Sequence, residues 1–138
     1  MKPPTFIDTS HLLALVNTND EYYEQANFAA AAIDSGLLTT EAVLTEFCNS
    51  LREARWRPIV IKTIIALRND TDTEILSVDT SLFSRAFELY RVRLDKNWSL
   101  TDCISFVVMQ ERGLTEALTT DHHFEQAGFC ALLREQKN

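Results

Sequence analysis

Short apolar runs alternate along this chain with longer stretches in which apolar residues recur every three or four positions. The first run predicts a strand that ends near Asp8. A short helix is expected at Leu12–Val16, followed by a longer helix at about Asp20–Ser35. Asn19 is a suitable N-cap for the longer helix, and Gly36 is a suitable residue to end it. The chain is therefore expected to open with a strand followed by helices.

The same alternation continues along the rest of the chain, with polar turns between the elements. The remaining predicted strands are Leu37–Thr39, Glu74–Val78, Glu116–Thr119 and Phe129–Leu133, and the remaining predicted helices are Thr40–Arg55, Pro58–Leu67, a helix capped by Asp79 or Thr80, and Ile104–Met109. Repeated alternation of strand and helix with short links predicts an α/β fold. In such a fold a mostly parallel sheet is covered by helices on both faces.

The helix at Ile104–Met109 has a recognisable beginning and end. The segment from Ser99 to Asp102 resembles a capping box, in which Asp replaces the usual Glu or Gln. Gly113 is expected to stop the same helix, because glycine readily takes the backbone conformation that follows a helix.

Four acidic residues stand where a predicted strand ends or a predicted helix begins: Asp8, Glu46, Asp102 and Asp121. In open α/β sheets, ligands bind at the carboxyl edge of the strands. A fold that joins these edges collects four oxygen donors. Mg²⁺ and Mn²⁺ prefer carboxylate and water oxygens to thiols and imidazoles, whereas zinc is disfavoured. The sequence therefore predicts a site for Mg²⁺ or Mn²⁺.

Each of these acids also has a structural explanation. Asp8 can end a strand by bonding its own turn, Asp102 can complement a helix dipole, Glu46 can be solvated, and Asp121 can form a turn. Taken together, however, all four have hydroxyl neighbours, which are suited to orienting a carboxylate or holding a metal-bound water. These neighbours are Thr9 and Ser10, Thr45, Thr101 and Thr120.

Length and composition are those of one ordinary globular domain. The chain has 138 residues, of which 46% are hydrophobic and 24% are charged. We expect a single domain spanning residues 1–138. No apolar run approaches the roughly eighteen residues of a membrane span, and no signal-type segment precedes the first strand. An intracellular, cytoplasmic protein with reduced and buried cysteines is expected.

The net charge argues against loose electrostatic binding of nucleic acid. The formal charge is −7 and the isoelectric point is near 4.9, whereas nucleic-acid binding normally requires a basic face. The four acids of the predicted site account for four of these charges, and bound cations would offset them locally. A nuclease is therefore still compatible with the composition.

At these acids the sequence resembles the PIN-domain family and, within it, the VapC-type toxins of bacterial toxin–antitoxin pairs. The resemblance covers nearly the whole chain. It depends on the joint order of short motifs: Phe6-Ile7-Asp8-Thr9-Ser10, Thr45-Glu46-Phe47, Leu100-Thr101-Asp102 and Thr119-x-Asp121-x-x-Phe124.

The resemblance implies a PIN-like three-layer α/β/α sandwich with a short central sheet. It also implies a Mg²⁺- or Mn²⁺-dependent endoribonuclease, a cognate antitoxin and a homodimer. The family's metal-binding roles transfer to Asp8, Glu46, Asp102 and Asp121. Thr9, Ser10 and Thr119 match polar positions around the family site, and Glu125 is either an auxiliary acid or a solvated helix residue.

Basic and apolar residues around Pro58 suggest two contact surfaces. Arg52, Arg55 and Arg57 are the cations we would test for contact with an RNA backbone, although such residues usually form a solvated face. Apolar residues of the same region suggest self-association; they are Trp56, Ile59, Ile61 and Ile65. Trp56 and Trp98 are able to stack on bases, but packing is the favoured role for both.

Two alternative interpretations are set against the nuclease. Asp121, His122 and His123 spell the motif of the DHH phosphoesterases, but those enzymes need further ligands, and a surface turn explains the two histidines better. The second alternative is a non-catalytic PIN-like module that binds RNA or protein through an acidic cleft. Retention of all four acids favours the enzyme.

Overall fold

The computed structural model describes residues 2–136, and within them five strands form one sheet in the order β3-β2-β1-β4-β5. Neighbouring strands are parallel throughout this sheet, which confirms the predicted parallel arrangement. The strands are β1 (Thr5–Ile7), β2 (Leu37–Thr40), β3 (Thr73–Leu76), β4 (Glu116–Leu118) and β5 (Cys130–Ala131). Because β1 lies at the centre, its carboxyl end is flanked by the ends of β2 and β4.

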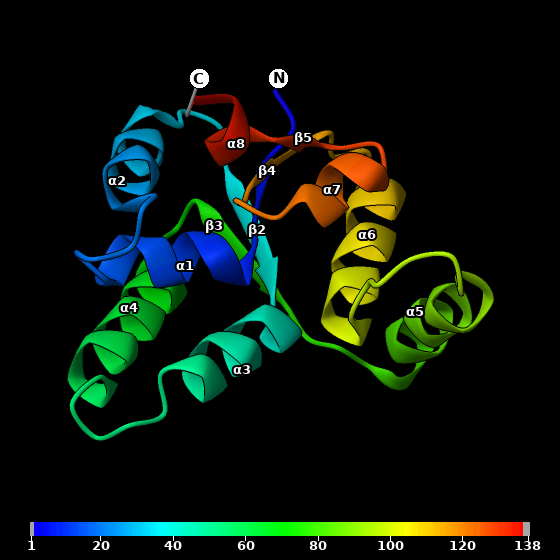
Figure 1. The fold of residues 1–138 in the computed structure, drawn as a ribbon, viewed down its shortest axis with the longest axis horizontal. Coiled ribbons are helices and arrows are strands. Elements are labelled where there is room, and N and C mark those ends of the chain that lie inside the picture. The colour runs from blue at the N-terminus through cyan, green and yellow to red at the C-terminus, as the bar shows by residue number, and fades with distance from the viewer. Residues whose placement is uncertain (1, 137–138) are drawn as a thin grey trace.

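Helices cover both faces of the sheet, as the strand–helix alternation predicts (Figure 1). On one side lie α1, α2 and α4, and on the other lie α6 and α7, with α5 packed outside α6 (Figure 1). The bounds are α1 (Thr9–Val16), α2 (Tyr23–Ala32), α3 (Glu41–Ser50), α4 (Arg57–Asn69), α5 (Thr80–Val92), α6 (Leu100–Arg112), α7 (His122–Gln126) and α8 (Leu132–Gln136).

An aromatic cluster fixes α6 and α7 against the sheet. Phe106 of α6 meets Phe124 of α7 edge to face at 4.9 Å between ring centroids, and it meets Trp98 in the same manner at 5.0 Å. Phe124 also contacts Phe6 of β1 at 6.3 Å. Such pairs add about 0.5–1.5 kcal/mol each beyond the burial of apolar area. Trp98 is buried, so its packing role is confirmed.

The strongest helix caps lie where the sequence predicts them. The Ser99 hydroxyl accepts a hydrogen bond from the Asp102 backbone N–H, and the Asp102 carboxylate accepts one from Ser99, so the capping box is formed. Asp79 caps α5 in the same way through Leu82. Gly113 ends α6 with a φ of 68°, a left-handed conformation in which a side chain would be strained.

Several predicted boundaries are wrong. Helix α2 is shorter than Asp20–Ser35, because Asp20 forms a turn in which its carboxylate accepts from the Tyr22 N–H; Tyr22, not Asn19, is the N-cap. Gly36 lies beyond the helix end, where its carbonyl accepts from the Thr5 backbone. The helix predicted to reach Arg55 ends at Ser50.

The region after β4 also differs from the prediction. The strand expected at Phe129–Leu133 is limited to Cys130–Ala131, and the chain then enters α8. Helix α7 was not predicted, because five residues are too few for a periodic apolar pattern. Cys103 is buried as expected, whereas Cys130 is exposed, so the expectation of buried cysteines is wrong for Cys130. Among the described helices none has the length and apolar character needed to cross a membrane.

Candidate metal centre

The four predicted acids lie on segments that meet at or beside the carboxyl edge of the sheet. Asp8 directly follows β1 and Asp121 follows β4, and these strands are neighbours. Asp102 lies in the first turn of α6, where the capping box holds its backbone. Glu46 lies on α3, which starts directly after β2. Strand order and helix starts therefore bring together residues that are far apart in the sequence.

Two hydroxyl groups orient the Asp8 carboxylate. Thr119 Oγ1 donates to Asp8 Oδ2 at 2.7 Å, and Ser10 Oγ donates to the same oxygen at 2.9 Å. Each hydroxyl in turn accepts a backbone N–H from the segment after β4: Thr119 accepts from Asp121 at 3.0 Å and Ser10 accepts from Thr120 at 3.0 Å. Asp8 is thereby tied to the loop that carries Asp121.

Thr9 contributes differently from these two residues. Its hydroxyl is buried and has no hydrogen-bond partner among the described residues. A backbone hydrogen bond from Thr9 helps to lower the pKa of Asp8, so the main chain of Thr9, not its side chain, acts on that carboxylate.

Burial makes the Asp8 carboxylate costly to ionise. Its side chain is almost inaccessible, and desolvation raises the pKa of Asp8 to about 6; the negative charge of Asp102 raises it further, while the hydrogen bonds from Thr119 and Ser10 oppose the shift. Burial also raises the pKa of Asp102, and the charges of Asp121 and Glu46 add to that effect. The centre therefore favours a bound positive charge.

His123 lies between two of the acids. Its Nδ1 is 3.3 Å from Asp102 Oδ2 and 3.2 Å from Asp121 Oδ1, and only 21% of its side chain is exposed. The Asp121 carboxylate caps α7 by accepting from the His123 backbone N–H, which holds the imidazole beside it. The expectation of a surface turn is wrong for His123, although it fits His122, whose side chain is 56% exposed.

Sequence reasoning missed His123 because the short helix α7 was not predicted. The spacing of Asp121 and His123 could have indicated it. An Asp at an N-cap accepts a hydrogen bond from the backbone N–H two or three residues later, which places the side chain of that residue close to the Asp carboxylate. Asp121 and His123 have this spacing.

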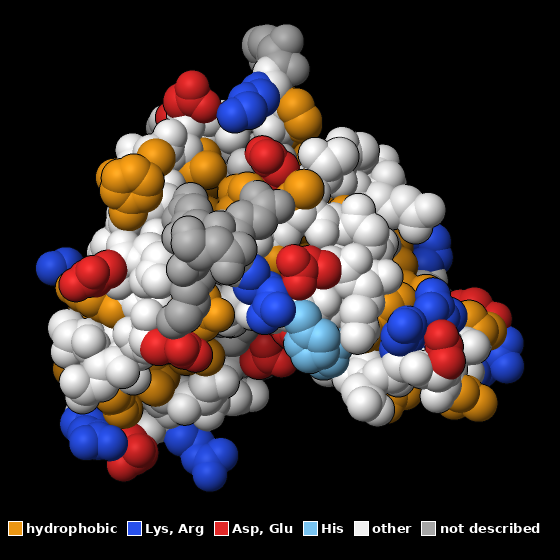
Figure 2. Space-filling model, turned by 45° about the horizontal axis from the view of Figure 1, so that its top comes forward, with side chains coloured by type: hydrophobic (Ala, Val, Ile, Leu, Met, Phe, Trp, Pro, Cys, Tyr) orange, Lys and Arg blue, Asp and Glu red, His pale blue; other side chains and the backbone are white. Residues whose placement is uncertain are grey.

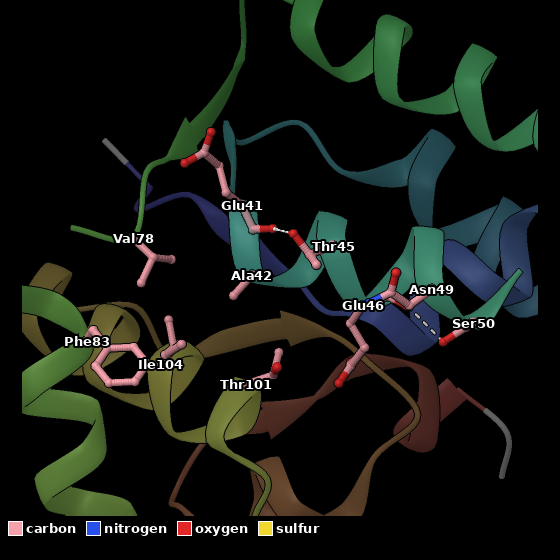
Figure 3. Close-up of a pocket in the computed structure, with 10 residues that line it drawn as sticks. All are labelled: Glu41, Ala42, Thr45, Glu46, Asn49, Ser50, Val78, Phe83, Thr101 and Ile104. Carbon is pink, nitrogen blue, oxygen red and sulfur yellow. Dashed lines mark hydrogen bonds between the residues drawn. The ribbon is translucent and has the colours of Figure 1, made fainter. Parts of the chain in front are cut away.

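Glu46 lies at the edge of an open pocket, half-buried on α3. Figure 3 shows its side chain extending toward Thr101, the residue before Asp102. Its charge contributes to raising the pKa of Asp102, which places it within electrostatic range of the other acids.

The donor atoms present are compatible with a divalent cation. Ligand atoms of Asp121, His122 and His123 lie within 4.8 Å of one another, and carboxylates with raised pKa values stand beside them. His123 Nδ1 is buried and forms no hydrogen bond among the described residues, although carboxylate oxygens of Asp102 and Asp121 lie within 3.3 Å of it, so the nitrogen and the two carboxylates face one another. Figure 2 shows histidine and acidic side chains adjacent on the surface.

The described contacts of Glu125 and of the three predicted arginines lie outside this cluster. Glu125 is exposed and pairs with Arg134 at 2.8 Å, so the solvated alternative describes it better than an auxiliary acid. Arg55 pairs with Glu53 at 3.6 Å, beyond the end of α3, and Arg52 and Arg57 lie in the same region. Arg134 is a cation that the sequence did not single out. It donates to the carbonyl of Thr120, the residue before Asp121, at 3.4 Å.

Comparisons with known proteins agree with this geometry. A family model described as PIN domain matches residues 5–129. The 23S rRNA-specific endonuclease VapC20 of Mycobacterium tuberculosis, in strains CDC 1551 / Oshkosh and H37Rv, is 30% identical over 131 residues, which cover 94% of this chain and 98% of that protein. The crystal structure of M. tuberculosis VapC20, described as a toxin that cleaves the sarcin–ricin loop, superposes with a TM-score of 0.83 at 28% identity, covering 92% of this chain and 97% of the other.

Proposed function

This chain belongs to the PIN-domain family, and we propose that it is a Mg²⁺- or Mn²⁺-dependent endoribonuclease that hydrolyses RNA phosphodiester bonds. The observation that carries the proposal is the coupled group of Asp8, Asp102 and Asp121, with Glu46 within electrostatic range. Carboxylates with perturbed pKa values are concentrated at functional sites, and a bound cation would favour the ionised form of each.

In this proposal Asp8, Glu46, Asp102 and Asp121 hold the metal. A bound divalent ion supplies positive charge beside the scissile phosphate and makes a water molecule more acidic. Ser10 and Thr119 keep the Asp8 carboxylate in one orientation, so little reorganisation is needed when the substrate arrives. No side chain becomes covalently attached, and the products carry 5′-phosphate and 3′-hydroxyl ends.

His123 is included in the proposed site as a nitrogen donor. Its Nδ1 lies 3.2 Å from Asp121 Oδ1 and 3.3 Å from Asp102 Oδ2, so it would be available to an ion held by these two carboxylates. Imidazole suits Mn²⁺ better than Mg²⁺, so the site is expected to prefer Mn²⁺ when both ions are offered.

The direct test is an RNA-cleavage assay with the wild-type protein in Mn²⁺, in Mg²⁺ and in EDTA. We expect cleavage with either ion and none in EDTA. Asp8→Asn and Asp102→Asn should abolish cleavage while circular dichroism shows an intact fold. Glu125→Gln is the matched control, because Glu125 is an acid near the site whose described partner is Arg134. Activity retained in both Asp variants contradicts the assignment, and EDTA-insensitive binding without product supports a non-catalytic module.

The proposed biological role is that of the toxin in a toxin–antitoxin pair, acting in the cytoplasm. The relative's name gives ribosomal RNA as its substrate, so intact ribosomes and purified 23S rRNA are the first substrates to assay. A cognate antitoxin is expected to suppress both the cleavage and the growth arrest caused by expression of this chain. Growth unaffected by expression, with cleavage retained in vitro, would favour RNA processing over a toxin role.

A homodimer is also proposed, through exposed isoleucines of α4. Ile59, Ile61 and Ile65 are 37%, 54% and 50% exposed, whereas Trp56 packs partly against the core. Light scattering should give twice the monomer mass for the wild type and the monomer mass for Ile61→Asp. A monomeric wild type contradicts this proposal.

A further inference from the structure

We propose that the pocket between α3 and the α5–α6 pair holds one unpaired base of the RNA substrate, stacked on Phe83. This inference rests on the proposed nuclease function and adds how the substrate is held. The pocket has a volume of about 560 Å³, within the range of small-ligand sites.

The pocket is continuous with the metal centre. Glu46, one of the proposed metal ligands, lines it from α3, and Thr101, the neighbour of Asp102, lines it from α6. Figure 3 shows Phe83 and Ile104 side by side on the wall opposite α3. In this proposal, a strand whose phosphate lies at the acids enters the pocket at Glu46 and extends toward the Phe83 ring.

Phe83 presents an exposed aromatic ring on α5. It is 45% exposed, and its ring stacks parallel to that of Phe87, with centroids 6.4 Å apart and an interplanar angle of 4°. The exposed part of the Phe83 ring is available to a ligand. Aromatic side chains that bind single-stranded nucleic acid stack on bases in this way, and each such contact contributes substantially to binding.

The charge of the pocket disfavours a phosphate group as its occupant. Glu41 and Glu46 both line it, and no Lys or Arg does so among the described residues. A phosphate group would be repelled there in the absence of a metal, whereas a neutral base would not. The polar side chains of α3, including Glu41 and Asn49, can accept hydrogen bonds from amino and imino groups at the edge of a base. An apolar helix from a protein partner would leave these groups without partners.

The test compares two phenylalanines of the same helix. Phe83 and Phe87 are almost equally exposed, at 45% and 46%, but only Phe83 is among the residues that line the pocket. For a single-stranded RNA substrate, Phe83→Ala should raise KM about tenfold or more, whereas Phe87→Ala should change it less than about twofold. Phe83→Trp should restore the wild-type KM, and Phe83→Leu, which keeps an apolar side chain without an aromatic face, should not.

Fluorescence provides a readout that does not depend on cleavage. Short RNAs carrying 2-aminopurine at successive positions are titrated into the wild-type protein and each variant. We expect one position to be quenched by the wild type and by Phe87→Ala, but not by Phe83→Ala. If the wild type does not cleave RNA, or cleaves it equally well in EDTA, the proposal of a metal-dependent nuclease fails, while quenching still reports on the pocket. Equal KM changes in the two Ala variants, or cleavage without quenching at any position, overturn the pocket proposal. Loss of antitoxin binding with unchanged RNA binding overturns it as well and assigns Phe83 to a protein partner.

Discussion

Thr119 donates a 2.7 Å hydrogen bond to Asp8 from a position 111 residues later in the chain. The bond forms because β1 and β4 are adjacent, so the residues that follow them leave the sheet at the same edge. The same hydroxyl accepts from the Asp121 backbone N–H. Thr119 therefore couples the positions of two proposed metal ligands.

Removal of the Thr119 hydroxyl should weaken metal binding. Thr119→Val has nearly the same shape but cannot donate to Asp8, so the carboxylate loses its orientation and its pKa rises further. We expect Mn²⁺ affinity to fall by about 10- to 100-fold, as is typical when the partner of a metal ligand is lost. Isothermal titration calorimetry measures this change. Thr119→Ser should retain most of the affinity, and Thr120→Val is the neighbouring control. Unchanged affinity in Thr119→Val shows that Asp8 needs no such support.

The pH dependence of stability should reveal the buried Asp8. Its pKa is raised from 3.8 to about 6, so the folded state binds a proton more tightly than the unfolded state. Stability from this group is therefore greatest at low pH and falls as pH rises from about 4 to about 6, by about 3 kcal/mol. In EDTA, we expect the free energy of unfolding of Asp8→Asn, relative to that of the wild type, to be about 3 kcal/mol greater at pH 7 than at pH 4. Urea unfolding at the two pH values measures the difference, and a constant difference shows that Asp8 ionises freely.

The buried His11 has the opposite effect on the pH dependence of stability, so the contribution of Asp8 is measured as a difference between Asp8→Asn and the wild type. Burial lowers the pKa of His11 from 6.5 to about 4, so the folded state resists its protonation. Stability from His11 is lost as pH falls through this range and is fully present above about pH 6.5. In the wild type the two contributions offset each other. The wild-type profile should accordingly be flatter than that of Asp8→Asn.

Metal should stabilise the folded protein. Closely spaced carboxylates repel one another in the absence of a cation, and an ion that binds only the folded state adds about 2.7 kcal/mol at 100 times its Kd. Differential scanning fluorimetry with millimolar Mg²⁺ or Mn²⁺ should show a higher melting temperature for the wild type. Asp8→Asn and Asp102→Asn should lose most of this shift. No change with either ion would falsify the metal site.

The nitrogen donor proposed at His123 predicts a change in metal preference. His123→Ala should lower Mn²⁺ affinity by about tenfold and Mg²⁺ affinity by less, because imidazole is a better ligand for Mn²⁺. His122→Ala is the matched control, since His122 is the adjacent and more exposed histidine. Electron spin-echo spectroscopy of the Mn²⁺-bound wild type should detect a nitrogen coupling that His123→Ala removes. A coupling that persists in His123→Ala but disappears in His122→Ala assigns the donor to the other ring.

Local signals accounted for the elements whose determinants lie close together in the sequence. The capping box of Ser99 and Asp102 spans four residues and formed as predicted, as did the glycine stop at Gly113. The start of α2 was predicted wrongly, because Asp20 forms a turn with Tyr22 and the helix begins only at Tyr23. The free-energy difference between such a turn and a helix start is small, and the spacing of apolar residues carries no information about it.

By itself, the sequence determined the kinds and the order of the elements from β1 to β4 and supplied the four candidate acids, because apolar spacing and helix caps act over a few residues. Only the tertiary structure decided which of the candidate acids lie near one another, since that depends on the strand order β3-β2-β1-β4-β5. The burial that raises the pKa of Asp8, the approach of His123 to Asp102 and the exposure of Phe83 in the pocket that Glu46 also lines were decided in the same way. Each is a relation between segments that are distant along the chain, and only packing of the complete fold sets such relations.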